Sequence, residues 1–440
     1  MAKAIEEALQ AFFAKDPAIL SGKENIDARS ERQKAFGELY KGVQEWNAKV
    51  PGDSCLRAVA WWKTALLNTY PTSQPKTKLL KEEVPDPLGK APTPIILHIP
   101  PGYRGKSTDL YPVILTTLDK DADPKKVFEA AYGPLLATHI VVAVAEDKVG
   151  TDRFRLLRGL SWVLSTYRAD HHRVALDGIG RGAALVDALG PEVAILFNGV
   201  VLRGPTTVSG VAANLGLFPC AAVLPSPAPA AVKEAVEGLK KAVSGLTVIE
   251  GLGTPAADAA IQSFLQSLPP RGIRDPSKPY TWFGASQGAR QVWGYWFAAN
   301  QAVDAGKDLP IRVHIDRDPA LNLVDIDCTN LAAGMLLLND EILDLDQPVV
   351  VRVNGVVVLT ATVTRDLSLL FASDGFFANS TWPRDLFITA AVVFDVPEEA
   401  RMPVAERKAL EEAQWKAAEA AAAAMRRAAE EQKAKDNPAP

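Results

Sequence analysis

The sequence predicts a mixed α/β fold in which a mostly parallel sheet is flanked by helices. Between residues 94 and 268, short apolar runs alternate with stretches of helical spacing, a pattern typical of parallel strands joined by helices. Helical patterns precede this part, and short strand-like runs follow it. The chain has 440 residues, more than the roughly 100 to 200 of a single domain, so we expect several units.

We divide the chain into four regions. Residues 1–75 are expected to form an N-terminal helical region and residues 76–272 the α/β region. Residues 273–397 are expected to form a small β-rich region, and residues 398–440 a long alanine-rich C-terminal helix with a frayed tail.

The N-terminal region shows three stretches of helical spacing before a proline-punctuated connector that has room for a short edge strand. These stretches are "AKAIEEALQAFFAK", "ERQKAFGELYKGVQEW" and "CLRAVAWWKTALLNTY". In the α/β region the predicted strands are "PIILHIP", "YPVILTTL", "HIVVAVA", "RVALDG", "ILFNGVVLRG", "FPCAAVLP" and "LTVIEG". Helices are predicted between most of them.

In the β-rich region, "PVVVRVNGVVVLTATV" predicts a hairpin because Asn354-Gly355 suits a type I′ turn between two apolar runs. Upstream, "RQVWGYWFAANQAV" over residues 290–303 has helical spacing and predicts an amphipathic helix. The C-terminal helix has mostly alanine on its apolar positions, so we expect a solvated helix or one that docks shallowly, and no long coiled coil.

Composition excludes several classes of function. A net charge of −4 gives no basic surface for nucleic acid, and no apolar run reaches the roughly 20 residues that span a bilayer. No metal motif pairs the five histidines, and the three cysteines are widely spaced. "DKDAD", residues 119–123, lacks the later residues of a calcium loop and is expected to cap a helix. We expect a cytoplasmic protein without cofactor or metal.

Three segments carry a resemblance to a known family. They are "HIPPGYRGKSTDLYPVILTTL", "DHHRVALDGIGRGAALV" and "LTVIEGLGTPAADAAIQSFL". In order and spacing, residues 94 to 268 resemble esterase- and peptidase-like α/β-hydrolases, and the β-rich region resembles the extension of some bacterial members. The resemblance implies an α/β-hydrolase sheet with a reactive serine on a G-x-S-x-G turn after a strand. A histidine, a carboxylate and an oxyanion loop would complete the site.

None of the four expected groups stands at its matching position. The turn reads Gly178-Ile179-Gly180-Arg181-Gly182, so glycine replaces the nucleophile. Ala228 lies where the carboxylate belongs, and Thr254 where the histidine belongs. The oxyanion loop matches a stretch ending at Asp119, whose negative charge would oppose an oxyanion.

Other residues offer weaker alternatives. "GASQG" matches the serine motif at Ser286, but only His314 follows it in the chain. Arg181 is a possible anion contact at the mouth of the former site, although an arginine on a solvated helix start is the simpler interpretation. Glu250 is the one carboxylate near the histidine position, without an evident partner.

These observations favour a catalytically inactive α/β-hydrolase homologue that works in binding or assembly. A protein partner or a second copy would be contacted through the terminal helices. The alternative is a serine hydrolase of esterase or peptidase type with a relocated nucleophile, Ser286. A third possibility is a purely structural subunit of a larger assembly.

Overall fold

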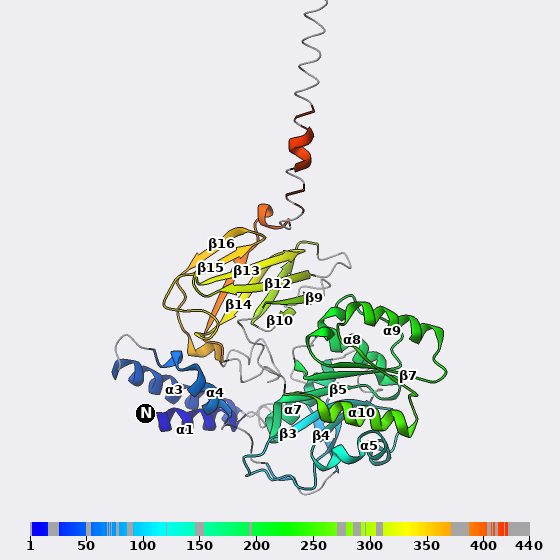
Figure 1. Ribbon diagram of the computed structural model, residues 1–440. Helices are drawn as coiled ribbons and strands as arrows, with labels where there is room; N and C mark the ends of the chain where they lie inside the picture. Colours follow the sequence, from blue (N-terminus) through cyan, green and yellow to red (C-terminus); the bar gives the residue numbers. More distant parts are fainter. Residues whose placement is uncertain are drawn as a thin grey trace, which may run out of the picture.

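The computed structural model places an α/β body next to a two-sheet β region, with a helical hairpin at the N-terminus (Figure 1). The structure describes residues 2–15, 26–49, 54–67, 79–85, 91–119, 121–145, 154–192, 196–270, 279–284, 292–294, 296–304, 311–370 and 387–402, with scattered residues at 69–75 and short helical stretches at 406–420.

The α/β body is built on an eight-stranded sheet with the order β1-β2-β4-β3-β5-β6-β7-β8. Only β2 runs against the others, since β1 and β4 both pair with it in antiparallel fashion and every other pairing is parallel. This is the α/β-hydrolase type of sheet, so the predicted fold class is confirmed. The strands are β1 Leu79–Val84, β2 Thr93–His98, β3 Tyr111–Leu118, β4 Ile140–Ala145, β5 Ala169–Asp177, β6 Gly199–Arg203, β7 Cys220–Leu224 and β8 Thr247–Glu250.

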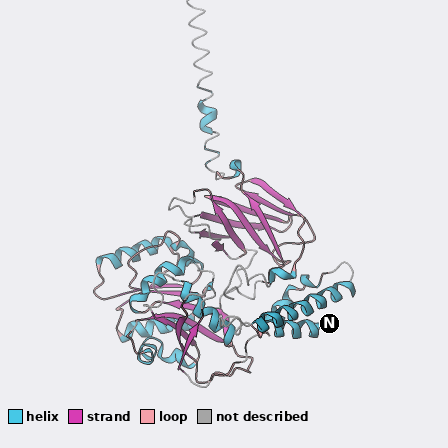
Figure 2. Cartoon of the chain, turned by 180° about the vertical axis from the view of Figure 1, so that it is seen from behind, coloured by secondary structure: helices cyan, strands magenta, loops and turns pink. Residues whose placement is uncertain are grey.

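Helices cover both faces of this sheet (Figure 2). Leu160 of α7 and Val186 of α8 belong to a core on one face, whereas Phe128 of α5 and Ile261 of α10 belong to a core on the other. Strands buried on both faces explain why β3 and β4 read as continuous apolar runs. The helical elements are α5 Pro124–Tyr132, η2 Gly133–Ala137, α7 Phe154–Thr166, η3 Gly180–Gly182, α8 Ala183–Glu192, η5 Ala212–Leu217, α9 Ala230–Ala242 and α10 Pro255–Ser267. Asp123 caps α5, as predicted.

The β-rich region consists of a four-stranded sheet, β10-β11-β14-β17, and a five-stranded sheet, β16-β15-β13-β12-β9, which share one apolar core. The predicted hairpin is confirmed: Asn354 and Gly355 have φ of 48° and 79° between β15 and β16. The elements are β9 Tyr280–Gly284, β10 Val292–Gly294, β11 Phe297–Ala302, β12 Ile311–Asp318, β13 Leu323–Thr329, β14 Leu331–Leu338, β15 Val349–Val353, β16 Val356–Ala361, η6 Leu367–Leu370, β17 Ala390–Asp395 and η7 Glu398–Ala400.

The helix predicted over residues 290–303 is wrong, because this stretch contains β10 and β11 instead. The pairing of β11 with β14 buries Trp296 and Phe297 in the core of the β-rich region. Phe297 also packs edge-on against Trp282 of β9, with ring centroids 6.2 Å apart. Burial against distant strands therefore overrides the local helical spacing.

The N-terminal helices pack against the β-rich region (Figure 1). In the sequence, all eight strands of the large sheet lie between these two parts. Trp62 is fully buried and stacks on Phe387 with ring centroids 5.2 Å apart. Arg57 Nη1 lies 2.8 Å from Asp346 Oδ2, and Lys63 pairs with Glu341. The helical elements here are α1 Ala2–Phe13, α3 Ile26–Lys49, η1 Cys55–Arg57 and α4 Val59–Leu67.

One buried side chain joins the large-sheet body to the β-rich region. The amide of Asn214, in η5, accepts from the backbone N–H of Phe283 at 2.9 Å and donates to the carbonyl of Phe283. It also donates to the carbonyl of Pro191 at 3.0 Å. Asn214 thus pairs with β9 as a neighbouring strand residue would, and it satisfies main-chain groups that burial would otherwise leave unpaired.

At the C-terminal end, the helical residues described between 406 and 420 are all exposed, Trp415 to 74%. A solvated C-terminal helix was one of the two expected outcomes. Among the described residues, no helix combines the length and apolar character needed to cross a bilayer.

We predict that Trp62→Ala lowers the free energy of unfolding by about 3 to 5 kcal/mol, because it leaves a large cavity beside Phe387. Urea unfolding followed by circular dichroism measures this. Trp415→Ala removes the same side chain from an exposed position and serves as the control, with an expected change within about 0.5 kcal/mol. Equal effects of the two variants would contradict the docked arrangement.

Candidate functional site

The sequence-predicted residues gather, by topology, near one edge of the large sheet. Asp119 directly follows β3, Gly180 follows β5, and Glu250 ends β8. Ala228 lies between β7 and α9, and Thr254 lies between β8 and α10. Because these strands are parallel, their carboxyl ends lie at the same edge, where open α/β sheets bind ligands.

The turn after β5 lies against β3. The Thr117 hydroxyl accepts from the N–H of Ile179 at 3.1 Å and donates to the carbonyl of the same residue at 3.0 Å. A Cβ on Gly182 would collide with the fully buried Thr117, and one on Gly178 would lie 2.7 Å from the Cα of Ala183. Close approach of backbone to its neighbours therefore explains the two outer glycines.

Gly180 lies at the centre of this turn, with φ of 63° and the carboxylate of Asp119 beside it. A Cβ built on Gly180 would lie 2.5 Å from Asp119 Oδ1 and 2.6 Å from Oδ2. A side chain at Gly180 would therefore need the carboxylate to move away. Asp119 occupies the space into which a residue at the centre of the turn would project.

The remaining predicted residues have separate local roles or positions. The Thr254 hydroxyl accepts from the N–H of Ala257 and donates to the carbonyl of Gly251 at 2.7 Å, so it caps α10. Glu250 is exposed and Ala228 half-buried. The side chain of Arg181 and all of Ser286 lie outside the described residues. The strand before Ser286, β9, is the terminal strand of the five-stranded sheet.

A buried charged cluster lies immediately beneath this edge, and sequence reasoning missed it. Asp177, the last residue of β5, is fully buried and accepts two hydrogen bonds from Arg203, Nε to Oδ1 at 2.8 Å and Nη2 to Oδ2 at 2.7 Å. The Tyr132 hydroxyl donates to Oδ2 at 3.0 Å. Arg203 Nη1 also lies 3.7 Å from Asp258 Oδ1, near the start of α10.

The electrostatics of this cluster keep Tyr132 and Arg203 protonated. Burial raises the pKa of Tyr132 well above its usual range, and the adjacent Asp177 raises it further, so the phenol stays protonated. Burial alone would lower the pKa of Arg203, but attraction to Asp177 outweighs it and the pKa is raised. A permanently charged guanidinium paired in bidentate fashion with a carboxylate holds β5 to β6 rather than moving protons.

A signal for this cluster was present in the sequence. The apolar strands "RVALD" and "GVVLR" each end on a charged residue, Asp177 and Arg203, just before glycine. The register pairs Asp177 with Val201, and Arg203 follows two residues later on the same face of the sheet, within reach of the carboxylate. The partner tyrosine and Asp258 come from helices, and their convergence depends on tertiary packing.

All five histidines are described, and none lies at the carboxyl edge. His139 precedes β4, and His98 pairs with Val141 at the start of β4, so both lie at the amino edge. His172 stands five residues before Asp177 along β5, a span of about 17 Å, and His171 is one residue further. His314 belongs to the β-rich region, where its Nδ1 lies 2.9 Å from the Thr281 hydroxyl.

The amino-edge histidine His139 is held neutral. Burial lowers its pKa to about 4. Among the described residues, no three histidine, cysteine, aspartate or glutamate side chains are grouped so that they could hold a metal ion.

Comparison with known proteins gives a likeness to solved structures only. No protein-family model matches the chain, and no curated protein matches it. Est1E from Butyrivibrio proteoclasticus is 10% identical with a TM-score of 0.33, over 44% of this chain and 99% of that chain. A dienelactone hydrolase from Anabaena variabilis is 14% identical with a TM-score of 0.32, over 43% of this chain and 97% of that one. A thermostable esterase is 14% identical with a TM-score of 0.33; the match covers 42% of this chain and 60% of the esterase.

We predict that Arg203→Met lowers the free energy of unfolding by about 3 to 5 kcal/mol, because it leaves the Asp177 carboxylate buried without its counter-charge. Chemical denaturation measures this. Arg352→Met breaks a half-exposed pair with Asp325 and should cost at most about 1 kcal/mol. The double variant Asp177→Asn with Arg203→Met should regain part of the loss. A single variant no less stable than the double one would refute the assigned role of the pair.

A second prediction concerns Asp187 on α8, the helix that follows the turn. Burial raises its pKa to about 7, and the one hydrogen bond from the backbone of Thr206 offsets this only in part. The folded state therefore holds a proton that the unfolded state, with a pKa near 3.8, releases. Unfolding free energy should consequently fall as pH rises from about 4 to about 7 and stay level above that.

Asp187→Asn keeps an acceptor and removes this titration. The unfolding free energy of the variant minus that of the wild-type chain should rise by on the order of 2 to 4 kcal/mol from pH 4 to pH 8. Urea unfolding at each pH measures this difference. Asp121→Asn, at an exposed position, serves as the control. A wild-type-minus-variant difference that stays constant with pH would show that Asp187 does not titrate in this window.

Proposed function

We propose that this chain is a non-catalytic homologue of the α/β-hydrolases that acts in binding or assembly. The observation that carries the proposal is the placement of the histidines. Acyl transfer by a serine nucleophile needs an imidazole within hydrogen-bond reach at the carboxyl edge of the sheet. His98, His139 and the pair in β5 lie toward the opposite edge, and His314 lies in a different sheet.

The nucleophile position supports the same proposal. Gly180 has no side-chain oxygen or sulfur to form an acyl bond. The neighbouring carboxylate of Asp119 would repel a developing oxyanion rather than stabilise it. The nearby charged groups Asp177 and Arg203 are bonded to each other beneath the turn. Membership of the chain in the hydrolase family and loss of its triad are both parts of this proposal.

A role in assembly agrees with how the other regions are attached. The N-terminal helices, which we had expected to contact partners, pack on the β-rich region of the same chain through Trp62 and Phe387. The C-terminal helix remains the proposed contact, because its described residues are exposed and include Trp415. Asn214 holds the large-sheet body and the β-rich region together, as a rigid building block requires.

The competing function is a serine hydrolase with Ser286 as nucleophile. It requires a histidine near the end of β9. The one histidine of this region, His314, pairs across from Thr281, while Gly284, the end of β9, pairs with Ile311. His314 is therefore three residues along β12 from Ile311, the residue opposite the end of β9, and does not lie beside that end.

Labelling with a fluorophosphonate probe, together with hydrolysis of p-nitrophenyl acetate, tests the proposal. The wild-type chain is expected to show neither reaction. Gly180→Ser restores a hydroxyl to the turn and is still expected to be inert, because no imidazole accompanies it. Labelled peptides would be mapped by mass spectrometry. Labelling of Ser286 that disappears in Ser286→Ala would establish the competing function instead.

A further inference from the structure

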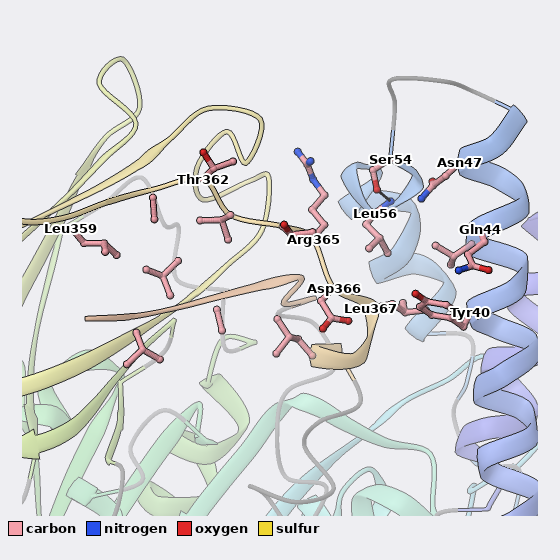
Figure 3. Close-up of a pocket in the computed structure, with 18 residues that line it drawn as sticks. Tyr40, Gln44, Asn47, Ser54, Leu56, Leu359, Thr362, Arg365, Asp366 and Leu367 are labelled. Atoms are coloured by element: carbon pink, nitrogen blue, oxygen red, sulfur yellow. Dashed lines mark hydrogen bonds between the residues drawn. The ribbon is translucent and has the colours of Figure 1, made fainter. Parts of the chain in front are cut away.

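A cleft of about 780 Å³ lies between the N-terminal helices and the β-rich region, and its described lining includes no residue of the large-sheet body (Figure 3). One wall is α3, with Tyr40, Gln44 and Asn47. The facing wall consists of the end of β16, the segment that follows it, and residues 391–393 of β17. Its volume falls in the range of about 300 to 1,000 Å³ that ligand pockets have.

The β17 wall of the cleft is the edge of a sheet. β17 is terminal in the order β10-β11-β14-β17, and within the described part of the chain it pairs only with β14. In antiparallel pairing, alternate residues exchange hydrogen bonds with the neighbouring strand. The N–H of Val396 donates to the carbonyl of Ala332, so the register places residues 390, 392 and 394 in the bonded positions. The main-chain groups of Ala391 and Val393 are consequently directed away from β14.

A segment of the same chain makes one main-chain hydrogen bond at the start of this edge and none that is described further along it. The N–H of Asp366 donates to the carbonyl of Thr389 at 2.6 Å, just before β17 begins. Beyond that point Ala391, Val392 and Val393 line the cleft. The Val393 side chain is 60% exposed, and across the cleft Tyr40 is 46% exposed. An exposed edge with apolar side chains favours pairing with a further strand.

The charges of the lining restrict what can enter. Among the described residues that line the cleft, one is a cation, Arg365, and one is an anion, Asp366. Arg365 is paired with two carboxylates: Nε lies 2.8 Å from Asp340 Oδ2, and Nη1 lies 2.7 Å from Asp346 Oδ1. Asp366 Oδ1 accepts from the N–H of Ser368 at 2.7 Å. The other described residues that line the cleft are uncharged, so an uncharged ligand matches most of the lining.

We propose that this cleft binds an extended, uncharged peptide segment of a partner protein, which adds a strand to β17. Main-chain groups of Ala391 and Val393 bind the peptide backbone, and apolar side chains at alternate peptide positions contact Val393 and Tyr40. The peptide lies between β17 and α3. Because α3 forms the facing wall, the cleft has room for one extended strand beside β17. This inference rests on the proposed binding role and names its partner by chemistry.

The test uses the full chain and a fluorescein-labelled, acetylated and amidated peptide, Thr-Val-Thr-Val-Thr-Val-Thr. Fluorescence anisotropy should show saturable binding, and replacing the threonines of the peptide with glutamate should weaken it at least about tenfold, because burial of unpaired carboxylates beside Asp366 is unfavourable. Amide hydrogen exchange measured by mass spectrometry should slow in the segment that contains β17 and not in the segment that contains β16.

Three variants locate the site. Val393→Pro removes an edge N–H and should abolish binding, whereas Val393→Thr keeps that N–H and the branched side chain and should retain it. Val357→Asp changes an exposed valine on β16, a terminal strand of the five-stranded sheet, outside the cleft. This variant should bind the peptide as the wild type does. Circular dichroism melting checks that each variant is folded.

Several results would overturn the proposal. These are no binding of the uncharged peptide, binding that Val393→Pro leaves intact, or binding without protection of β17. A wild-type dimer in light scattering that Val393→Pro dissociates would also overturn it, in favour of pairing between two copies. Hydrolase labelling does not depend on this cleft, so failure here is distinguishable from failure of the proposed function.

Discussion

The structure of the carboxyl edge depends on how closely the turn after β5 approaches β3. The Thr117 hydroxyl binds both main-chain groups of Ile179, and the space beside Gly182 is filled by the Thr117 side chain. Such close packing needs glycine whether or not a nucleophile stands at the centre of the turn. The close approach therefore accounts for Gly178 and Gly182 independently of the residue at position 180. The turn joins β5 to α8.

Two features fill the space at and below the turn. Asp119 lies where a central side chain would project, and below it the Asp177–Arg203 pair satisfies its own hydrogen bonds with help from Tyr132. The Asp177 and Arg203 charges are bonded to each other and buried. Exposed or hollowed surfaces in the described part of the chain lie elsewhere, on the edge strand β17, in the cleft beside α3, and on the C-terminal helix.

Much of the fold followed from local patterns, and the exceptions have a common cause. The apolar runs of the large sheet, the Asn354-Gly355 hairpin and the Asp123 cap were predicted because each depends on neighbouring residues. β10 and β11 were missed because burial of Trp296 and Phe297 depends on β14. The docking of Trp62 on Phe387 and the cluster at Asp177 likewise join residues far apart in sequence. The turn at Gly180 and the position of Asp119 near it were expected from sequence, but the direct approach of the carboxylate to the space beside Gly180 depends on tertiary packing.

The Asp119 carboxylate holds the space that a nucleophilic side chain at position 180 would need. A double-mutant cycle on unfolding free energy measures this directly, with Gly180→Ala made in the wild-type chain and in Asp119→Gly. The positive φ of Gly180 penalises alanine in both backgrounds, so the difference between them isolates the contact. We predict that Gly180→Ala costs about 1 to 3 kcal/mol more when Asp119 is present. The same cost in both backgrounds would contradict the claim.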